Sequence, residues 1–397
     1  MSFVLLIAAA FVLGGAIMRR LGLRTGYGVL AVRMYVGMSA CALLVLVVGG
    51  ASLLAVQTLL FVLALLGLLV EVLDSTRRRT RPVGVKQGPL SPLEYTCVAA
   101  VGASLLLALL SAFAPASGYE AAVAHLALPE AYAEEGRIAL SPGIPTRALQ
   151  GAAHWLHCLL AVTFHRGGET PATLLNWGFA GLACAALFRL GERIAGRRAG
   201  LAATALFATA PVFMDQTGAV SAHLPFVGLT LGALLSVVAW FDMPRAGAPA
   251  WPERATDDYA RHVLGRRVKF RVAYPGRPPE PVAWLVVAGG LAGSACGIRP
   301  AGLLVGGLLG VGVLFGPRRG RWRGVGALLG TMLLAAAPWL LRDAVVGGLS
   351  LSGLRQSVPP LSVEQLLAWL RVPWDLVMRP SLYGGWSRSP GGMLLAL

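Results

Sequence analysis

Ten runs of mostly apolar residues, each about 16 to 22 residues long, alternate with short polar segments along the chain. A run of this length can cross the roughly 30 Å hydrocarbon core of a bilayer as an α-helix. Because lipid offers the backbone no hydrogen-bond partner, helices are the natural form of such segments. The pattern therefore predicts an all-α, polytopic transmembrane bundle of about ten spans, at 3–18, 34–50, 52–72, 97–115, 171–188, 199–214, 220–241, 282–297, 301–316 and 325–341.

The composition agrees with a membrane protein and argues against soluble classes. Of the 397 residues, 56% are hydrophobic and 13% are charged, whereas a soluble domain carries about a quarter charged residues. The net charge of +16 would suit nucleic-acid binding, but the basic residues lie in short loops and form no single stripe. Nucleic acid is therefore not expected as a partner, whereas membrane lipids are. The five cysteines contain no CxxC pair, so a disulfide framework or zinc ribbon is not expected.

Arginine clusters predict which loops are cytoplasmic. The positive-inside rule assigns four basic segments to the cytoplasm: Arg77–Arg81, Arg189–Arg198, 243–281 and Arg318–Arg323. An even number of crossings must then separate each pair of these segments. A crossing at 150–166 would break this parity, so that apolar stretch, which contains three histidines, is expected as an interfacial helix on the outer side.

This topology divides the chain into three regions. Residues 1–96 are expected to form N-terminal helices, the first one retained rather than cleaved as a signal peptide, and a basic cytoplasmic loop. Residues 97–341 form a core with a structured outer loop at 116–170, containing interfacial amphipathic helices, and a flexible, Pro- and Arg-rich cytoplasmic insertion at 243–281. Residues 342–397 are expected to be an extracytoplasmic amphipathic segment that is truncated.

Glycines recur at four-residue spacing in two consecutive apolar runs. Faces of small residues let helices approach closely in lipid, so these two helices are expected to pack together. No glycine-rich fingerprint lies between a strand and a helix, and dinucleotide binding is not expected. The glycines are Gly289, Gly293, Gly297, Gly302, Gly306 and Gly310.

Three charged residues are predicted to lie at the same, outer membrane face. Glu120 follows the fourth long span, Arg299 lies in the turn CGIRPAG, and Arg342 ends the tenth span. Arginine binds phosphate through charge-assisted, bidentate hydrogen bonds. An acid beside arginines at this level suits a general base that faces an anionic lipid head group.

The stretch from Tyr119 to Ile138, YEAAVAHLALPEAYAEEGRI, resembles the first outer loop of GT-C-type glycosyltransferases, the superfamily of protein mannosyltransferases and lipid A aminoarabinose transferases. That loop commonly has an aspartate, then Tyr-His-Leu, a proline, a tyrosine and Gly-Arg-Ile. Further similar stretches follow in the same order, so that the resemblance covers roughly residues 97–390: LGERIAGRRAGLAATALFATAPVF, GLAGSACGIRPAG, PWLLRD and VPWDLVMRP.

The resemblance implies transfer of a sugar, with inversion, from a polyprenyl-phosphate donor to a lipid, glycan or protein acceptor outside a bacterial plasma membrane. It implies that Glu120 is the general base and that Arg299 and Arg342 contact the donor phosphate. The further candidates for substrate contacts are Tyr119, His125, His223 and Asp343.

This chain departs from the family pattern at four positions. It has Glu120 for the usual aspartate, Ala124 for the tyrosine before the histidine, His223 at a second acidic position and Asp343 for an asparagine. Glutamate is one methylene longer than aspartate, and catalysis tolerates a shift of only about an ångström.

Other functions remain open at this stage. His125, His154, His157 and His165 could hold a divalent metal, but no acidic partner recurs at a fixed offset, and no metal or other cofactor is expected. A non-catalytic membrane subunit or scaffold would keep the spans without needing Glu120. A transporter is less expected, because the spans contain few charges and the chain contains no internal repeat.

Overall fold

The computed structural model describes residues 3–23, 29–77, 89–114, 125–139, 153–164, 169–218, 220–242, 282–316 and 320–347. Within these ranges the regular structure is entirely helical, with no strand, so the all-α prediction is confirmed. The helices are α1 (Phe3–Arg20), α2 (Leu30–Gly49), α3 (Leu53–Arg77), α4 (Pro92–Ser111), α5 (Ala127–Glu135), α7 (His154–Thr163), α8 (Thr170–Ala195), α9 (Arg197–Thr209), α10 (Pro211–Gly218), α11 (His223–Asp242), α13 (Val282–Cys296), α14 (Ala301–Phe315) and α15 (Arg321–Gly347).

Seven of the described helices are long and apolar enough to cross a membrane: α1, α2, α3, α4, α8, α11 and α15. The helices α13 and α14 are apolar but have only 15 residues each, about 22 Å at 1.5 Å per residue. The outer faces of α3 and α4 expose leucines such as Leu54 and Leu107, as expected for helices that face lipid. The chain is therefore an integral membrane protein, whereas the predicted number of about ten spans is not confirmed.

The predicted span at 199–214 is interrupted. Helix α9 ends at Thr209, Ala210 has an extended conformation with ψ of 131°, and α10 begins at Pro211. Proline has no backbone N–H and clashes with the preceding turn of a helix. The prediction of one continuous helix was therefore wrong at this position.

Helix α7 lies in the interior of the bundle. Each of its residues from His154 to Thr163 is buried, and Trp155 packs against Phe179 of α8 with ring centroids 5.6 Å apart. Gln57 of α3 donates a hydrogen bond to the Val162 carbonyl at 3.1 Å. An interfacial helix would expose a polar face. The ten-residue length agrees with the prediction of a non-crossing helix at 150–166, and the burial of α7 shows that other protein segments cover it, whereas its placement at the membrane interface stays a prediction.

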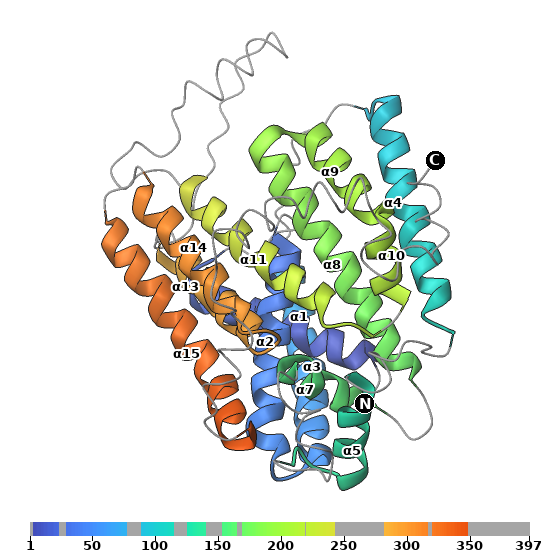
Figure 1. Ribbon diagram of the computed structural model, residues 1–397, viewed down its shortest axis with the longest axis vertical. Helices are drawn as coiled ribbons and strands as arrows, with labels where there is room; N and C mark the ends of the chain where they lie inside the picture. The colour runs from blue at the N-terminus through green and yellow to red at the C-terminus, as the bar shows by residue number, and fades with distance from the viewer. Residues whose placement is uncertain are drawn as a thin grey trace, which may run out of the picture.

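The glycine faces allow close helix packing, as predicted. A Cβ atom at Gly289 or Gly293 of α13 would collide with backbone carbonyl oxygens of α15, and one at Gly297 would meet the Trp339 ring. The glycine face of α13 therefore packs against α15, which was not predicted. The predicted packing of α13 with α14 is found near their shared turn, where a Cβ atom at Gly302 would collide with the Cys296 backbone. Figure 1 shows α15 along one side of the bundle and α4 along the opposite side.

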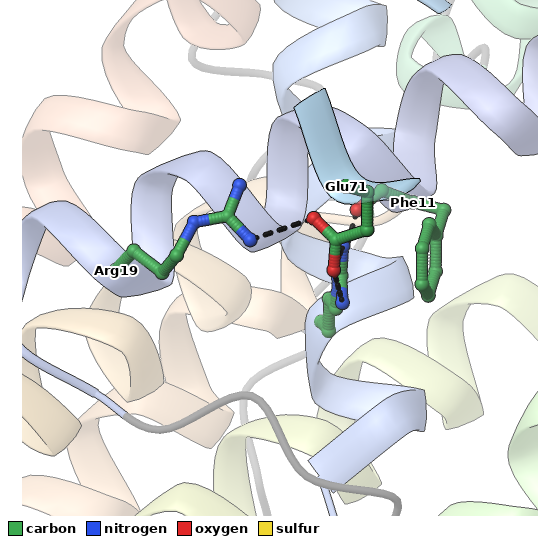
Figure 2. A network of polar contacts seen from close by, with 4 residues as sticks. Phe11, Arg19 and Glu71 are labelled. Carbon is green, nitrogen blue, oxygen red and sulfur yellow. Dashed lines mark hydrogen bonds and ion pairs between the residues drawn. The ribbon is translucent and has the colours of Figure 1, made fainter. Parts of the chain in front are cut away.

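Charged networks tie helix ends together away from the segment 125–139. Glu94, in a capping box with Ser91 at the start of α4, accepts hydrogen bonds from Arg197 at 2.7 and 3.0 Å. Glu71 near the end of α3 accepts one from Arg19 of α1 at 2.8 Å (Figure 2) and two from Arg33 of α2 at 3.2 Å. The opposite end of α2, at Gly49, contacts Ile138.

Candidate functional site

The segment from His125 to Ala139 docks onto the turn between α2 and α3. Helix α5 ends at Glu135 and is capped by Gly136, whose φ of 68° lies in the left-handed region that favours glycine. The chain then pairs with the turn, because Ile138 N–H donates to Gly49 O at 2.7 Å and Leu53 N–H donates to Gly136 O at 2.8 Å. The Gly-Arg-Ile part of the motif thus fixes this segment at one end of the bundle, together with the last turns of α15 (Figure 1).

Arg342 on α15 attaches this segment to the bundle. Its Nη2 donates to the Tyr132 hydroxyl at 2.6 Å and to the Ala139 carbonyl at 2.9 Å. The side chain is 7% exposed, and its guanidinium carbon lies 5.6 Å from the Tyr132 ring centroid. Arg342 therefore has a structural role here, and its predicted contact with the donor phosphate stays a prediction.

Arg299 is the more accessible of the two predicted phosphate-binding arginines. It lies between α13 and α14, is half-buried, and has Nη2 3.1 Å from Nε2 of His223, the first residue of α11. The guanidinium can only donate, so His223 Nε2 is the acceptor and its ring hydrogen resides on Nδ1. A neutral imidazole that orients a partly exposed guanidinium leaves the positive charge available to an anion.

A second polar group lies beside Arg342. Asp343, with 40% of its side chain exposed, has Oδ1 2.9 Å from Nε2 of the buried His154. The approach is close but is not aligned as a hydrogen bond. One turn along α7, His157 has Nε2 3.4 Å from Nδ1 of His125. The rings of His154 and His157 are edge to face, with centroids 6.4 Å apart.

The contacts made by Arg299 and those made by Arg342 and Asp343 lie near each other, because both sets adjoin the end of α13. Trp155 N–H donates to the Gly297 carbonyl at 2.9 Å, and the Trp339 ring lies against Gly297. The structure thus gathers five predicted residues at one end of the bundle, whereas Tyr119 and Glu120 lie outside the described residues. The five are His125, His223, Arg299, Arg342 and Asp343.

The contribution of Tyr132 was missed, although the motif contains this tyrosine, and no sequence signal paired His154 with Asp343. Burial raises the pKa of Tyr132 above its ordinary value, and it raises the pKa of the Cys158 thiol to about 12. Both groups therefore keep their protons at neutral pH.

Among the described residues, no group of three or more His, Cys, Asp or Glu side chains could hold a metal ion.

Comparison of the chain with protein-family models, with curated proteins and with solved structures finds no match. The similarity to GT-C-type enzymes therefore rests on the motifs of this chain.

Replacing Tyr132 by phenylalanine is expected to destabilise the protein by about 2 kcal/mol, because a hydrogen bond to a buried charged group is worth roughly 1.5–3 kcal/mol. Arg342 Nη2 would keep only the Ala139 carbonyl as an acceptor. The measurement is reversible unfolding in detergent micelles. Tyr95→Phe is the matched control, because Tyr95 is 60% exposed, and it should change stability by less than about 0.5 kcal/mol. Equal effects of the two substitutions would contradict the role given to Tyr132.

Proposed function

We propose that this protein is a glycosyltransferase of the bacterial plasma membrane that transfers a sugar from a polyprenyl-phosphate donor to a lipid, glycan or protein acceptor. The proposal rests on the resemblance of residues 97–390 and on one structural observation. A partly exposed Arg299, oriented by His223, lies at the same end of an apolar helical bundle as the docked segment 125–139.

The position of the arginines supports an extracytoplasmic site. Arg197 lies at the start of α9 and Arg321 at the start of α15, whereas Arg299 and Arg342 lie at the other ends of neighbouring helices. If the arginine-rich loops are cytoplasmic, the candidate site faces outward. Ten crossings then require α13, α14 and the α9–α10 pair to cross as well. The 15 residues of α13 and of α14 would cross a locally thinned bilayer, and the 22 residues of the α9–α10 pair are long enough to cross without thinning.

In this proposal Arg299 holds the donor phosphate and stabilises its growing negative charge as the sugar leaves. Glu120 removes the proton from the acceptor hydroxyl, whose oxygen attacks the anomeric carbon from the face opposite the phosphate and inverts it. The role of Arg342 changes from a phosphate ligand to a positioning residue, because both of its Nη2 bonds go to residues 132 and 139.

Arg299→Gln is expected to lower sugar transfer roughly 10- to 100-fold, since a charge-assisted contact contributes about 1.5–3 kcal/mol. The assay uses membranes with labelled polyprenyl-phosphate sugars and compares wild type, Arg299→Gln and Glu120→Gln. Arg323→Gln is the control, because Arg323 is exposed at the start of α15, at the end of the bundle away from the candidate site, and it should retain full activity.

Loss of transfer in Glu120→Gln with normal folding would support Glu120 as the base. Equal transfer by wild type and Glu120→Gln would remove Glu120 from the site while leaving the enzyme in place. No transfer by well-folded wild type with any donor would overturn the proposal in favour of a non-catalytic membrane subunit.

A further inference from the structure

Two arginines share one carboxylate near the end of α3 that lies away from the docked segment 125–139. Glu71 Oε1 accepts hydrogen bonds from Nη1 and Nη2 of Arg33, each at 3.2 Å, and Oε2 accepts one from Nη1 of Arg19 at 2.8 Å (Figure 2). Arg33 is buried and also donates from Nε to the Phe11 carbonyl, so all three of its nitrogens are used. Arg33 therefore neutralises Glu71, and the positive charge of Arg19 is in excess.

The last turn of α1 presents this excess charge at the surface. The Arg19 side chain is 33% exposed, and its hydrogen bonding within the described part of the chain uses Nη1 alone. The neighbouring Arg20 is exposed, and its side chain has no hydrogen bond or ion pair with another described residue. The carbonyls of Met18 and Arg19 accept from Leu23 and Gly22 N–H at 2.8 and 2.9 Å, so the negative end of the helix is capped. Two guanidinium groups can therefore receive an anion here.

The charged turn adjoins a surface that faces lipid. Close packing of α1 on α3, where a Cβ atom at Gly67 would collide with Val12, holds Arg19 at the edge of the apolar face of α3. Four residues of that face in the two turns before Glu71 are each more than half exposed: Leu65, Leu66, Leu69 and Val70. A ligand at Arg19 thus has positive charge on one side and lipid-exposed hydrocarbon on the other.

The length of α3 places this site about one membrane thickness from the docked segment. Glu71 lies 18 residues after Leu53, which bonds to Gly136 of that segment. At 1.5 Å per residue the separation along the helix is about 27 Å, close to the roughly 30 Å of the hydrocarbon core. The site is therefore at the level of lipid head groups if the docked segment lies at the opposite surface.

We propose that Arg19 and Arg20 bind the phosphate of an anionic phospholipid, whose acyl chain lies along the exposed apolar face of α3. This inference goes beyond the proposed function and does not depend on it. Arginine binds phosphate oxygens through charge-assisted hydrogen bonds, and basic sites beside transmembrane helices recognise anionic head groups. A lipid fits better than a free phosphate ion, because the positive charge and the lipid-facing hydrocarbon surface are adjacent.

The sequence around the site has the same sign of charge. The stretch 24–28, which follows α1, contains Arg24 and no acid. The stretch 74–81, which follows Glu71 along the chain, contains one aspartate and four arginines. The net charge of these stretches therefore adds to the attraction for an anionic head group.

The test measures the lipid that stays bound to detergent-solubilised protein by native mass spectrometry, with phosphatidylglycerol and phosphatidylcholine as probes. Wild type should prefer phosphatidylglycerol, and Arg19→Gln should weaken its binding roughly fivefold without affecting phosphatidylcholine. Arg193→Gln is the matched control, because Arg193 is also in the last turn of a helix and 31% exposed but has its own carboxylate partner, Asp242. This control removes the same charge and should leave the affinity unchanged.

Arg20→Gln is a second test variant that leaves the pairing with Glu71 intact, so its folding should be normal, and it should also weaken phosphatidylglycerol binding. Equal weakening by Arg19→Gln and Arg193→Gln would overturn the site in favour of a diffuse effect of charge. Equal affinity of wild type for the two lipids would overturn it as well. Displacement of phosphatidylglycerol by millimolar inorganic phosphate would reassign the site to a small anion. None of these outcomes depends on sugar transfer, so the proposed function is tested separately.

Discussion

Replacing Glu71 by glutamine is expected to destabilise the protein by about 3 kcal/mol, because it leaves the buried charge of Arg33 without its counter-ion. Glu71 is the acceptor for both Arg19, at 2.8 Å, and Arg33, at 3.2 Å. The Arg33 side chain is 6% exposed. Breaking a buried pair from one side typically costs 3–5 kcal/mol, and the 28% exposure of Glu71 favours the lower part of that range.

The remaining contacts of Arg33 cannot compensate for this loss. Its Nε donates to the Phe11 carbonyl at 2.8 Å, and its guanidinium carbon lies 3.5 Å from the Phe11 ring centroid. Neither contact carries a full negative charge. Figure 2 shows Glu71 facing Arg19, with Phe11 of α1 close by. Because the three helices α1, α2 and α3 meet at this carboxylate, its loss should loosen the N-terminal part of the bundle.

Unfolding in detergent micelles, followed by circular dichroism, measures the effect. Asp242→Asn is the matched control, since Asp242 pairs with Arg193 at 3.3 Å with 56% of its side chain exposed, and exposed pairs contribute about 0–1 kcal/mol. The double variant Arg33→Met with Glu71→Leu should recover most of the lost stability, because an apolar pair often replaces a buried ion pair without cost. A Glu71→Gln variant as stable as Asp242→Asn would refute this account.

The positions of the long helices were predictable from sequence, because the hydrophobic length needed to cross lipid is a local property of the chain. The gathering of Arg299, Arg342 and Asp343 at one end agrees with the sequence prediction, which assumed an even number of crossings between arginine clusters and so assigned all three residues to one membrane face. The roles assigned to these residues remain predictions.

The contacts of Arg342 were not predictable in the same way. Whether an arginine at a helix end binds phosphate or a neighbouring segment depends on what packs beside it. Here Tyr132 and Ala139 lie more than 200 residues away in sequence. Hydropathy also does not distinguish burial in protein from burial in lipid, which explains why the complete burial of α7 by neighbouring helices was not predicted. Pro211 could have predicted the break between α9 and α10. The apolar residues on both sides of it led instead to the prediction of one continuous span.

Replacing Gly37 by alanine is expected to destabilise the protein by about 4 kcal/mol, because α1 and α2 cross with their backbones in contact at this residue. A Cβ atom at Gly37 would lie on the carbonyl oxygen of Ala10, far inside van der Waals contact, and one at Gly14 would lie on that of Arg33. The contact between the two helices is therefore reciprocal. Gly37 of α2 faces the Ala10 carbonyl, four residues before Gly14 on α1, and Gly14 faces the Arg33 carbonyl, four residues before Gly37 on α2. Overpacking usually costs 1–3 kcal/mol and more where backbone must move.

Gly102→Ala is the matched control for Gly37→Ala. Gly102 also lies within a helix, α4, but a Cβ atom there would meet nothing within 4 Å. Alanine favours helix over glycine by about 0.5–1 kcal/mol, so Gly102→Ala should stabilise the protein slightly. The same residue change is therefore expected to act in opposite directions at two helical positions.

Separation of α1 from α2 would also displace Arg33 from Glu71, so Gly37→Ala combined with Glu71→Gln should destabilise by less than the sum of the two single effects. Strict additivity would mean that the crossing and the ion pair are independent.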